Sequence, residues 1–239
     1  MKLGILGGMG PLATADFFKK IVQMTDVRSD QEHIRILMDD NPQIPDRTAY
    51  IMGEGKDPTR AMVRSALRLE FMGADFVAIP CNTAHRFHSA IQSFLDIPVL
   101  NMVDLTGAYI KQVWPETQKV LLLATKGTYT AGIYNFALNS RKMELLVPSL
   151  EDQTLLMEWI YAVKSTGSIP DSESVTRMIQ TYTGGLNIPV ILGCTELPVI
   201  FDALKLEGRF VDTTHVLAEE CVKLGKSKPA LSSQNPDIA

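Results

Sequence analysis

Two cysteines occupy matching positions in the two halves of the chain. Cys81 follows the apolar run at residues 75–80, and Cys194 follows a similar run at 188–193, 113 residues later. Each cysteine precedes an amide or hydroxyl residue and then a stretch expected to be helical. Ligands bind at the carboxyl ends of the strands in parallel α/β sheets. Two thiols placed in this way can take a proton from one face of a carbon atom and return one to the other face.

A second pair of segments shows the same correspondence. Residues 3–10 and 120–127 are apolar runs that pass through small residues towards a helix, at an offset of 117 residues. Matching offsets indicate an internal duplication of about 115 residues, a period much longer than that of a solenoid repeat. We therefore expect an α/β fold of two pseudo-symmetric, doubly wound lobes with mainly parallel sheets and an active site in the cleft between them.

The elements that must position these cysteines follow from the alternation of apolar runs and amphipathic stretches. Strands are predicted near residues 3–7, 34–39, 75–80, 98–101, 119–124, 143–147, 189–193 and 210–211. Helices are predicted at residues 12–25, 58–72, 84–95, 104–113, 130–139, 151–165, 171–184 and 214–224. Residues 41–57 show no periodicity and are expected to form a loop, and a loop this long in a compact domain is often functional.

Composition narrows the function classes. The chain has 239 residues, of which 46% are hydrophobic and 21% charged, and its net charge of −4 does not favour nucleic acid or an anionic membrane as a partner. No apolar stretch has the length of a membrane span, and no signal-peptide pattern is seen. Three cysteines, an odd number, fit reduced thiols in the cytoplasm. Cys221 is expected in the core, and residues 227–239 are expected to form a flexible tail.

The glycine-rich start of the chain offers an alternative from another enzyme class. Residues 8–13 fit the loose G-x-G-x-x-A dinucleotide pattern, and Asp39 or Asp40 can supply the acid at the end of the next strand. A Rossmann-type oxidoreductase is therefore one hypothesis. Against it, Pro11 removes a backbone donor from the helix start, and the pattern leaves both cysteines unexplained. A turn that brings backbone amides to a substrate carboxylate is the simpler interpretation.

Two cations stand where an acidic substrate can use them. Arg47 lies in the long loop, and a guanidinium suits a carboxylate because it can form two parallel hydrogen bonds. Lys164 closes an amphipathic helix, but the chain shows no phosphate cup that would support a Schiff base with pyridoxal phosphate. His85 and His88 follow Cys81 at a spacing seen in zinc sites, but no fourth ligand is near, so no metal is predicted.

The motifs together resemble one known family. Residues 6–10 (Leu-Gly-Gly-Met-Gly), 80–85 (Pro-Cys-Asn-Thr-Ala-His) and 193–197 (Gly-Cys-Thr-Glu-Leu) resemble motifs of the aspartate/glutamate racemase superfamily. The loop at 44–48 and the helix end at 160–164 are similar to those of its aspartate racemase branch. The resemblance extends to about residue 225 and rests on five motifs in order, which makes it specific.

The resemblance implies an isomerase that interconverts L- and D-aspartate, or glutamate, without a cofactor. It implies that Cys81 and Cys194 act as the acid and the base, and that Arg47 and Lys164 hold substrate carboxylates. Some relatives carry threonine in place of one cysteine, whereas this chain keeps both. Maleate isomerisation, in which one thiol attacks carbon as a nucleophile, is an alternative on the same fold.

The resemblance also implies how the lobes divide and assemble. The chain is expected to return to the first lobe near residue 210, so that residues 1–103 and 211–226 form one lobe and residues 104–210 form the other. The lobed subunits are expected to pair into a homodimer.

The chemistry defines a wider set of candidate residues. Removing an α-proton without pyridoxal phosphate leaves negative charge, which amides and hydroxyls at the strand ends can stabilise on the α-carboxylate. One cysteine must begin as thiolate and the other as thiol, and a helix N-terminus after each favours the thiolate. The expected substrate-binding residues are Met9, Arg47, Asn82, Thr83, Thr125, Thr128, Lys164, Thr195 and Glu196.

Overall fold

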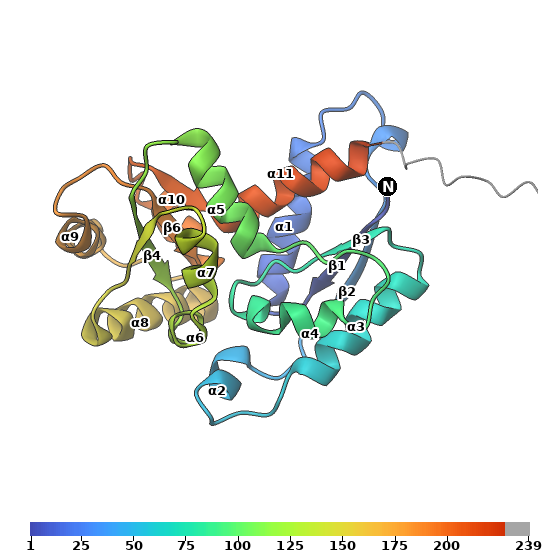
Figure 1. The fold of residues 1–239 in the computed structure, drawn as a ribbon, viewed down its shortest axis with the longest axis horizontal. Coiled ribbons are helices and arrows are strands. Elements are labelled where there is room, and N and C mark those ends of the chain that lie inside the picture. The colour runs from blue at the N-terminus through green and yellow to red at the C-terminus, as the bar shows by residue number, and fades with distance from the viewer. Residues whose placement is uncertain (228–239) are drawn as a thin grey trace, which may run out of the picture.

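The computed structural model describes residues 1–227 and shows two α/β lobes, each built on a parallel sheet (Figure 1). The first sheet has the order β2-β1-β3, with strands Ile36–Asp40, Leu3–Gly7 and Phe76–Ala78. The second has the order β5-β4-β6-β7, with strands Glu144–Leu146, Lys119–Ala124, Val190–Gly193 and Phe210–Asp212. The predicted two-lobed α/β fold with parallel sheets is confirmed. Of the predicted tail, residues 228–239 lie outside the described part of the chain.

Helices surround both sheets and connect successive strands. They are α1 (Pro11–Met24), α2 (Arg47–Ile51), α3 (Thr59–Phe71), α4 (His88–Gln92), α5 (Met102–Val113), α6 (Lys126–Ala131), α7 (Ile133–Asn139), α8 (Leu150–Thr166), α9 (Ser172–Thr183), α10 (Glu196–Ala203) and α11 (Thr213–Lys226). Two short 3₁₀ helices, η1 (Asp30–Glu32) and η2 (Thr83–Phe87), complete the list. Within residues 1–227, none of the helices combines the length and the apolar character that crossing a membrane requires.

The central strand of the first sheet is buried on both faces, which explains its unbroken apolar sequence. Leu3 and Ile5 face one core, where they join Phe17 of α1 and Leu217 of α11. Leu6 belongs to the opposite core, whose helical wall is α3. Cys221 lies in the core of Leu3 and Ile5, as predicted, and burial raises the pKa of its thiol.

The second sheet repeats this arrangement with different helices. Leu121 and Leu123 of β4 pack in one core with Ile160 of α8 and with α10. The alternate residues of β4 face a second core, which contains Tyr134 of α7 and residues of α5. The carboxyl ends of β3 and β6, which precede Cys81 and Cys194, are thus fixed by buried strands in both lobes.

The strand predicted at residues 98–101 is wrong. The structure has a single bridge there, between Val99 and Val77. Pro98 has no backbone N–H to extend a ladder, and Asn101 already caps α5, where its side chain accepts from the amides of Val103 and Asp104. The helix therefore begins three residues after the bridge.

Three further segments differ from prediction. The expected loop at 41–57 contains α2, which begins after Asp46 because that carboxylate accepts from the amide of Ala49 at 2.7 Å. The helix expected at 84–95 starts as η2 and continues only to Gln92 in α4. The helix expected at 130–139 begins earlier, as α6, and is interrupted at Gly132, whose φ of 60° leaves the helical region.

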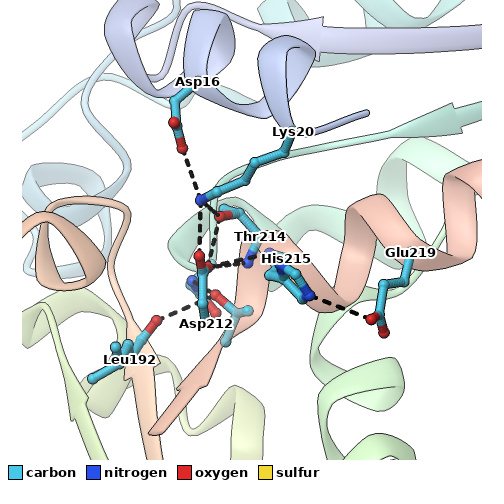
Figure 2. Close-up of polar contacts among 9 residues, drawn as sticks. Asp16, Lys20, Leu192, Asp212, Thr214, His215 and Glu219 are labelled. Carbon is cyan, nitrogen blue, oxygen red and sulfur yellow. Dashed lines mark hydrogen bonds and ion pairs between the residues drawn. The ribbon is translucent and has the colours of Figure 1, made fainter. Parts of the chain in front are cut away.

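The start of α11 connects the lobes. Residues 210–212 form β7, which pairs with β6 in the second sheet, while α11 packs against α1 of the first lobe. Figure 2 shows Lys20 of α1 between Asp16 and Asp212. The Nζ of Lys20 lies 2.8 Å from a carboxylate oxygen of each. Burial disfavours the charged forms of Lys20 and Asp212, but the ion pairs and hydrogen bonds outweigh it. The pKa of Lys20 is therefore raised and that of Asp212 is lowered. The lobe limits at residues 103 and 210 stay a prediction.

Candidate active site

A small, partly open cavity lies where the two lobes meet, and both strand-end cysteines line it. It leaves about 30 Å³ for water, enough for about two molecules. The predicted residues that line it are Met9, Arg47, Cys81, Asn82, Thr83, Thr125, Lys164, Cys194 and Thr195. Thr128 and Glu196 lie just behind this wall, because each makes hydrogen bonds to residues that line it. The structure thus brings all the predicted site residues to one place, while their roles stay predictions.

Arg47 is the first residue of α2, and its guanidinium is partly engaged by backbone carbonyls. Its Nη1 donates to the carbonyls of Ile44 at 3.3 Å and Pro45 at 3.0 Å, and its Nη2 donates to that of Met9 at 3.3 Å. The Nε–H is buried and has no partner among the described residues. Because Nε and Nη2 form one edge of the guanidinium, this edge retains donors for a carboxylate.

Three threonine hydroxyls form a closed triangle between the lobes. Thr83 of η2 lies 3.0 Å from both Thr125 and Thr128, whose hydroxyls are 3.1 Å apart. Thr125 also caps α6. In α6, a Cβ added to Gly127 would lie 2.7 Å from the hydroxyl of Thr48 in α2. Glycine at this position therefore allows α2 to pack closely on α6. The triangle places hydroxyl groups from both lobes on the cavity wall.

The surroundings of Cys81 hold its backbone. The Nδ1 of His85 lies 2.9 Å from the carbonyl oxygen of Cys81, and the amide of Met102 donates to Nε2 at 3.0 Å. Since an amide only donates, Nε2 accepts and Nδ1 carries the proton that it donates to Cys81. Burial lowers the pKa of His85 to about 4, so the ring is neutral. With both nitrogens engaged, His85 has none free for a metal, and residues 1–227 contain no cluster of three or more metal-binding side chains.

The surroundings of Cys194 act on its thiol. Its Sγ donates to Oε2 of Glu196 at 2.8 Å, and the hydroxyl of Thr195 donates to the same oxygen at 3.1 Å. Burial and the charge of Glu196 raise the pKa of Cys194 well above its ordinary value, although Lys164 opposes them. Burial and the neighbouring carboxylate thus act against the effect that we expect from the helix N-terminus after Cys194, and that expected effect stays a prediction.

Lys164 stands in the last turn of α8 and faces the same carboxylate. Its Nζ lies 3.7 Å from Oε1 of Glu196. Burial acts to lower the pKa of Lys164, but the effects of Cys194 and Glu196 are larger in sum, so the pKa is raised and the amine is charged. Glu196 therefore accepts from a thiol and a hydroxyl and pairs with an ammonium. Its contacts in this structure are with the protein's own groups.

Several residues that line the cavity are not among those predicted from the sequence. Met157, Ile160 and Tyr161 line the cavity together with Lys164. Their spacing of seven, four and three residues before Lys164 places them on one face of α8, so a helical projection from Lys164 identifies them. Asp46 and Thr48 beside Arg47, and Gly193 beside Cys194, also line the cavity.

Residues 6–221 match the family described as Asp/Glu/Hydantoin racemase. The chain belongs to this family. The match spans both lobes and includes both cysteines, Arg47 and Lys164. The predicted membership of the aspartate/glutamate racemase superfamily is confirmed, and the protein is an isomerase of the racemase type.

Individual relatives agree with this assignment. The chain is 27% identical over 228 residues to the broad specificity amino-acid racemase RacX of Bacillus subtilis, covering 92% of this chain and 96% of RacX. The structure of Picrophilus torridus aspartate racemase is 32% identical, with 94% of each chain covered and a TM-score of 0.76. An aspartate racemase homologue from Pyrococcus horikoshii is 26% identical, covers 95% of this chain and 99% of its own, and has a TM-score of 0.77. These neighbours support the predicted aspartate racemase branch.

Proposed function

We propose that the enzyme interconverts L- and D-aspartate by transferring protons between Cys81, Cys194 and the α-carbon. The observation that carries this proposal is that both thiols line one cavity with Arg47, whose buried Nε–H has no partner among the described residues. Burying a cationic donor without a hydrogen-bond partner costs free energy, and an anion that accepts from it would remove this cost. A dicarboxylic amino acid supplies one carboxylate for Arg47 and a second for the hydroxyls and amides of the wall.

The environments of the thiols suggest how the proton moves. Cys194 is held as a thiol by its bond to Glu196, so we expect Cys194 to act as the acid and Cys81 to act as the base in the first direction of transfer. Cys81 removes the α-proton from one face, and Cys194 protonates the other. The resulting Cys194 thiolate lies beside Glu196, and the charge of Lys164 offsets part of their repulsion. For the other enantiomer, the roles are exchanged.

Geometry and charge set two conditions on this reaction. Sulfurs that each approach one carbon to about 3–3.5 Å must be roughly 7 Å apart. The negative charge that develops on the α-carboxylate needs donors in place, and Asn82, Thr83 and Thr125 provide them on the cavity wall. Because the cavity has room for only about two water molecules, we expect the lobes or α2 to move apart when an amino acid enters.

The first experiment tests the substrate. Purified, dialysed enzyme is incubated with each enantiomer of aspartate, glutamate and alanine without added cofactor, and chiral chromatography follows the products. We expect racemisation of aspartate in both directions and little of alanine, which lacks the second carboxylate. Alanine turned over as fast as aspartate would show that Arg47 and Lys164 do not select the substrate, and a requirement for pyridoxal phosphate or nicotinamide would refute direct transfer by the thiols.

A second experiment tests the use of two bases. In heavy water, newly formed D-aspartate should carry deuterium at Cα from the first turnovers, while the remaining L-aspartate keeps its proton. The deuterium on the acid faces the wrong side of the carbon to exchange into unreacted substrate. Early deuterium in both pools would instead indicate one base that reaches both faces.

The assembly and location of the enzyme are part of the proposal. We expect a homodimer that acts in the cytoplasm. Light scattering after size-exclusion chromatography measures the molar mass and so tests for the dimer. A fully active monomer would contradict this expectation.

A further inference from the structure

A buried chain of side-chain hydrogen bonds runs between the lobes beside both cysteines. The hydroxyl of Tyr134 in α7 donates to Oδ1 of Asn82 at 2.5 Å. The Nδ2 of Asn82 donates to the hydroxyl of Thr213 at 2.9 Å, and that hydroxyl donates to the carbonyl of Leu192 at 3.3 Å. Tyr134, Asn82 and Thr213 are each at most 3% exposed.

The donors and acceptors in this hydrogen-bond chain can be assigned in only one way, because the backbone carbonyl at its end can only accept. The carbonyl of Leu192 only accepts, so Thr213 must donate to it with its single proton. The oxygen of Thr213 must therefore accept from Asn82, which turns the amide nitrogen of Asn82 towards Thr213 and its oxygen towards Tyr134. Tyr134 must then donate. Bonds that all point the same way polarise and strengthen one another in a buried setting.

Two members of this hydrogen-bond chain stand close in sequence to the two cysteines. Asn82 directly follows Cys81, and Leu192 stands two residues before Cys194 on β6. Thr213 follows Asp212, whose carboxylate binds Lys20 of the first lobe, and Figure 2 shows Asp212 together with Leu192. The backbone segments that carry the two thiols are thus linked through Asn82 and the start of α11.

The chain also determines how Asn82 meets the cavity. Its amide nitrogen has two protons, and Thr213 uses one of them. Asn82 lines the cavity, so the second N–H is the group that remains for a substrate carboxylate. If the amide rotated by a half turn, it would present an oxygen acceptor instead of this donor.

We propose that Tyr134 and Thr213 are positioning residues for racemisation, which act through Asn82. They hold its N–H towards the substrate and keep the segments of Cys81 and Cys194 at a fixed separation. This inference rests on the proposed function, because only a reaction that uses both thiols needs that separation. Displacements of about 1 Å in such a site reduce turnover by about 100-fold.

Removing one hydroxyl from the chain tests the role in catalysis. For Tyr134→Phe and Thr213→Val, we expect kcat for aspartate to fall by about 10- to 100-fold while KM changes by less than about threefold, since the loss affects the transition state more than binding. Thr213→Ser keeps the hydroxyl and should restore most of the kcat. Unchanged kcat in folded Tyr134→Phe and Thr213→Val would overturn the proposal.

A matched variant separates positioning from a general loss of stability. Tyr182 of α9 donates to Asp152 and accepts from the amide of Ser149 at 2.7 Å, and these contacts stay within the second lobe. Tyr182→Phe should lower the Tm as Tyr134→Phe does but leave kcat unchanged. An equal loss of kcat in both variants would show that the effect of Tyr134 is only structural.

A double-mutant cycle tests whether Tyr134 acts through Asn82. Adding Tyr134→Phe to Asn82→Ala should reduce kcat no further, because the amide that Tyr134 orients is already absent. If the losses of kcat in the two single variants multiply fully in the double variant, Tyr134 does not act through Asn82.

An NMR measurement keeps this inference separate from the proposed substrate. In ¹⁵N-asparagine-labelled enzyme, the side-chain amide proton of Asn82 that bonds to Thr213 should exchange slowly with solvent, faster in Thr213→Val, and at the wild-type rate in Tyr182→Phe. Fast exchange in the wild type overturns the chain. If the wild type racemises no acidic amino acid while this proton is protected, the proposed function fails but the chain stands.

Discussion

The two strand-end cysteines occupy equivalent positions but have different surroundings. At Cys81, neutral His85 donates to the backbone carbonyl, and the side chain of the next residue, Asn82, donates to Thr213. At Cys194, the contact reaches the thiol itself, which donates to the carboxylate of Glu196. The duplicated fold therefore sets where the two cysteines lie, whereas the neighbouring side chains give the two thiols different surroundings.

This difference gives the site a resting state without symmetry. Burial and Glu196 favour the protonated form of Cys194, and in the proposed reaction this thiol is the acid. The two enantiomers have equal free energies, so kcat/KM must still be equal in the two directions. The asymmetry therefore appears in the pH dependence and in the response to substitution, and not in the equilibrium.

The largest effect is expected from removing either thiol. Cys81→Ala and Cys194→Ala should each reduce racemisation of both enantiomers by at least about 1,000-fold, because each direction needs one cysteine as base and the other as acid. The measurement is chiral analysis of the initial rates. Cys221→Ala serves as the control, since Cys221 lies in the core away from the cavity. Substantial racemisation by one of the two single variants would show that the paired contexts do not reflect paired functions.

Arg47→Ala should reduce kcat/KM for aspartate by about 100-fold, because it removes the unpaired donor edge that a carboxylate needs. Circular dichroism melting checks the fold. Arg209→Ala is the matched control, since Arg209 stacks on the ring of Trp114 at 5.5 Å and does not line the cavity. Equal kcat/KM in Arg47→Ala and the wild type would make Arg47 a structural residue of α2.

Glu196→Gln tests the origin of the asymmetry. Losing the carboxylate charge should lower the pKa of Cys194, so the high-pH limb of kcat/KM, where this acid loses its proton, should move to lower pH by about one unit or more. The thiolate absorbance of Cys194, measured against pH in a Cys81→Ser background, reads the same shift directly. Glu219→Gln, on the surface of α11, should leave both curves in place. A limb that stays where it is, or moves to higher pH, would refute the role of Glu196.

The smallest effect on turnover is expected from the ion pair that connects the lobes. Lys20→Met should lower the free energy of unfolding by about 1–3 kcal/mol with little change in kcat, since it leaves Asp212 partly buried without its cation. Lys19→Met, at an exposed position on the same helix, is the control. Urea unfolding at several pH values measures the difference, and a large fall in kcat would mean that the ion pair belongs to the catalytic machinery.

The pH dependence of that difference has a definite sign. The pKa of Asp212 is lowered by folding, so its contribution is present above about pH 4 and disappears as the pH falls through the folded pKa. The pKa of Lys20 is raised, so its contribution persists up to about pH 10 and is lost above that. The stability difference between wild type and Lys20→Met should therefore be greatest between these limits.

The sequence by itself determined the position of each cysteine and the class of fold. An apolar run that ends in a polar residue before a helix marks the carboxyl end of a buried parallel strand, and such ends converge on a ligand site. The repeated offset indicated two lobes, and the cations Arg47 and Lys164 were found because they stand within the recognised motifs. Short elements were predicted poorly. The five residues of α2 are too few to show periodicity, and the segment of the bridge at Val99 was predicted as a full strand.

Only the tertiary structure decided how the candidate side chains are used. Asn82 meets Thr213 across 131 residues of sequence and Tyr134 across 52, and no local pattern encodes such pairings. Glu196 was expected to bind substrate from its place beside Cys194, but the orientation of its carboxylate towards the thiol depends on how α8 brings Lys164 to the other oxygen. Sequence periodicity reports which face of an element is buried, whereas the partners of a buried polar group depend on which elements the fold brings together.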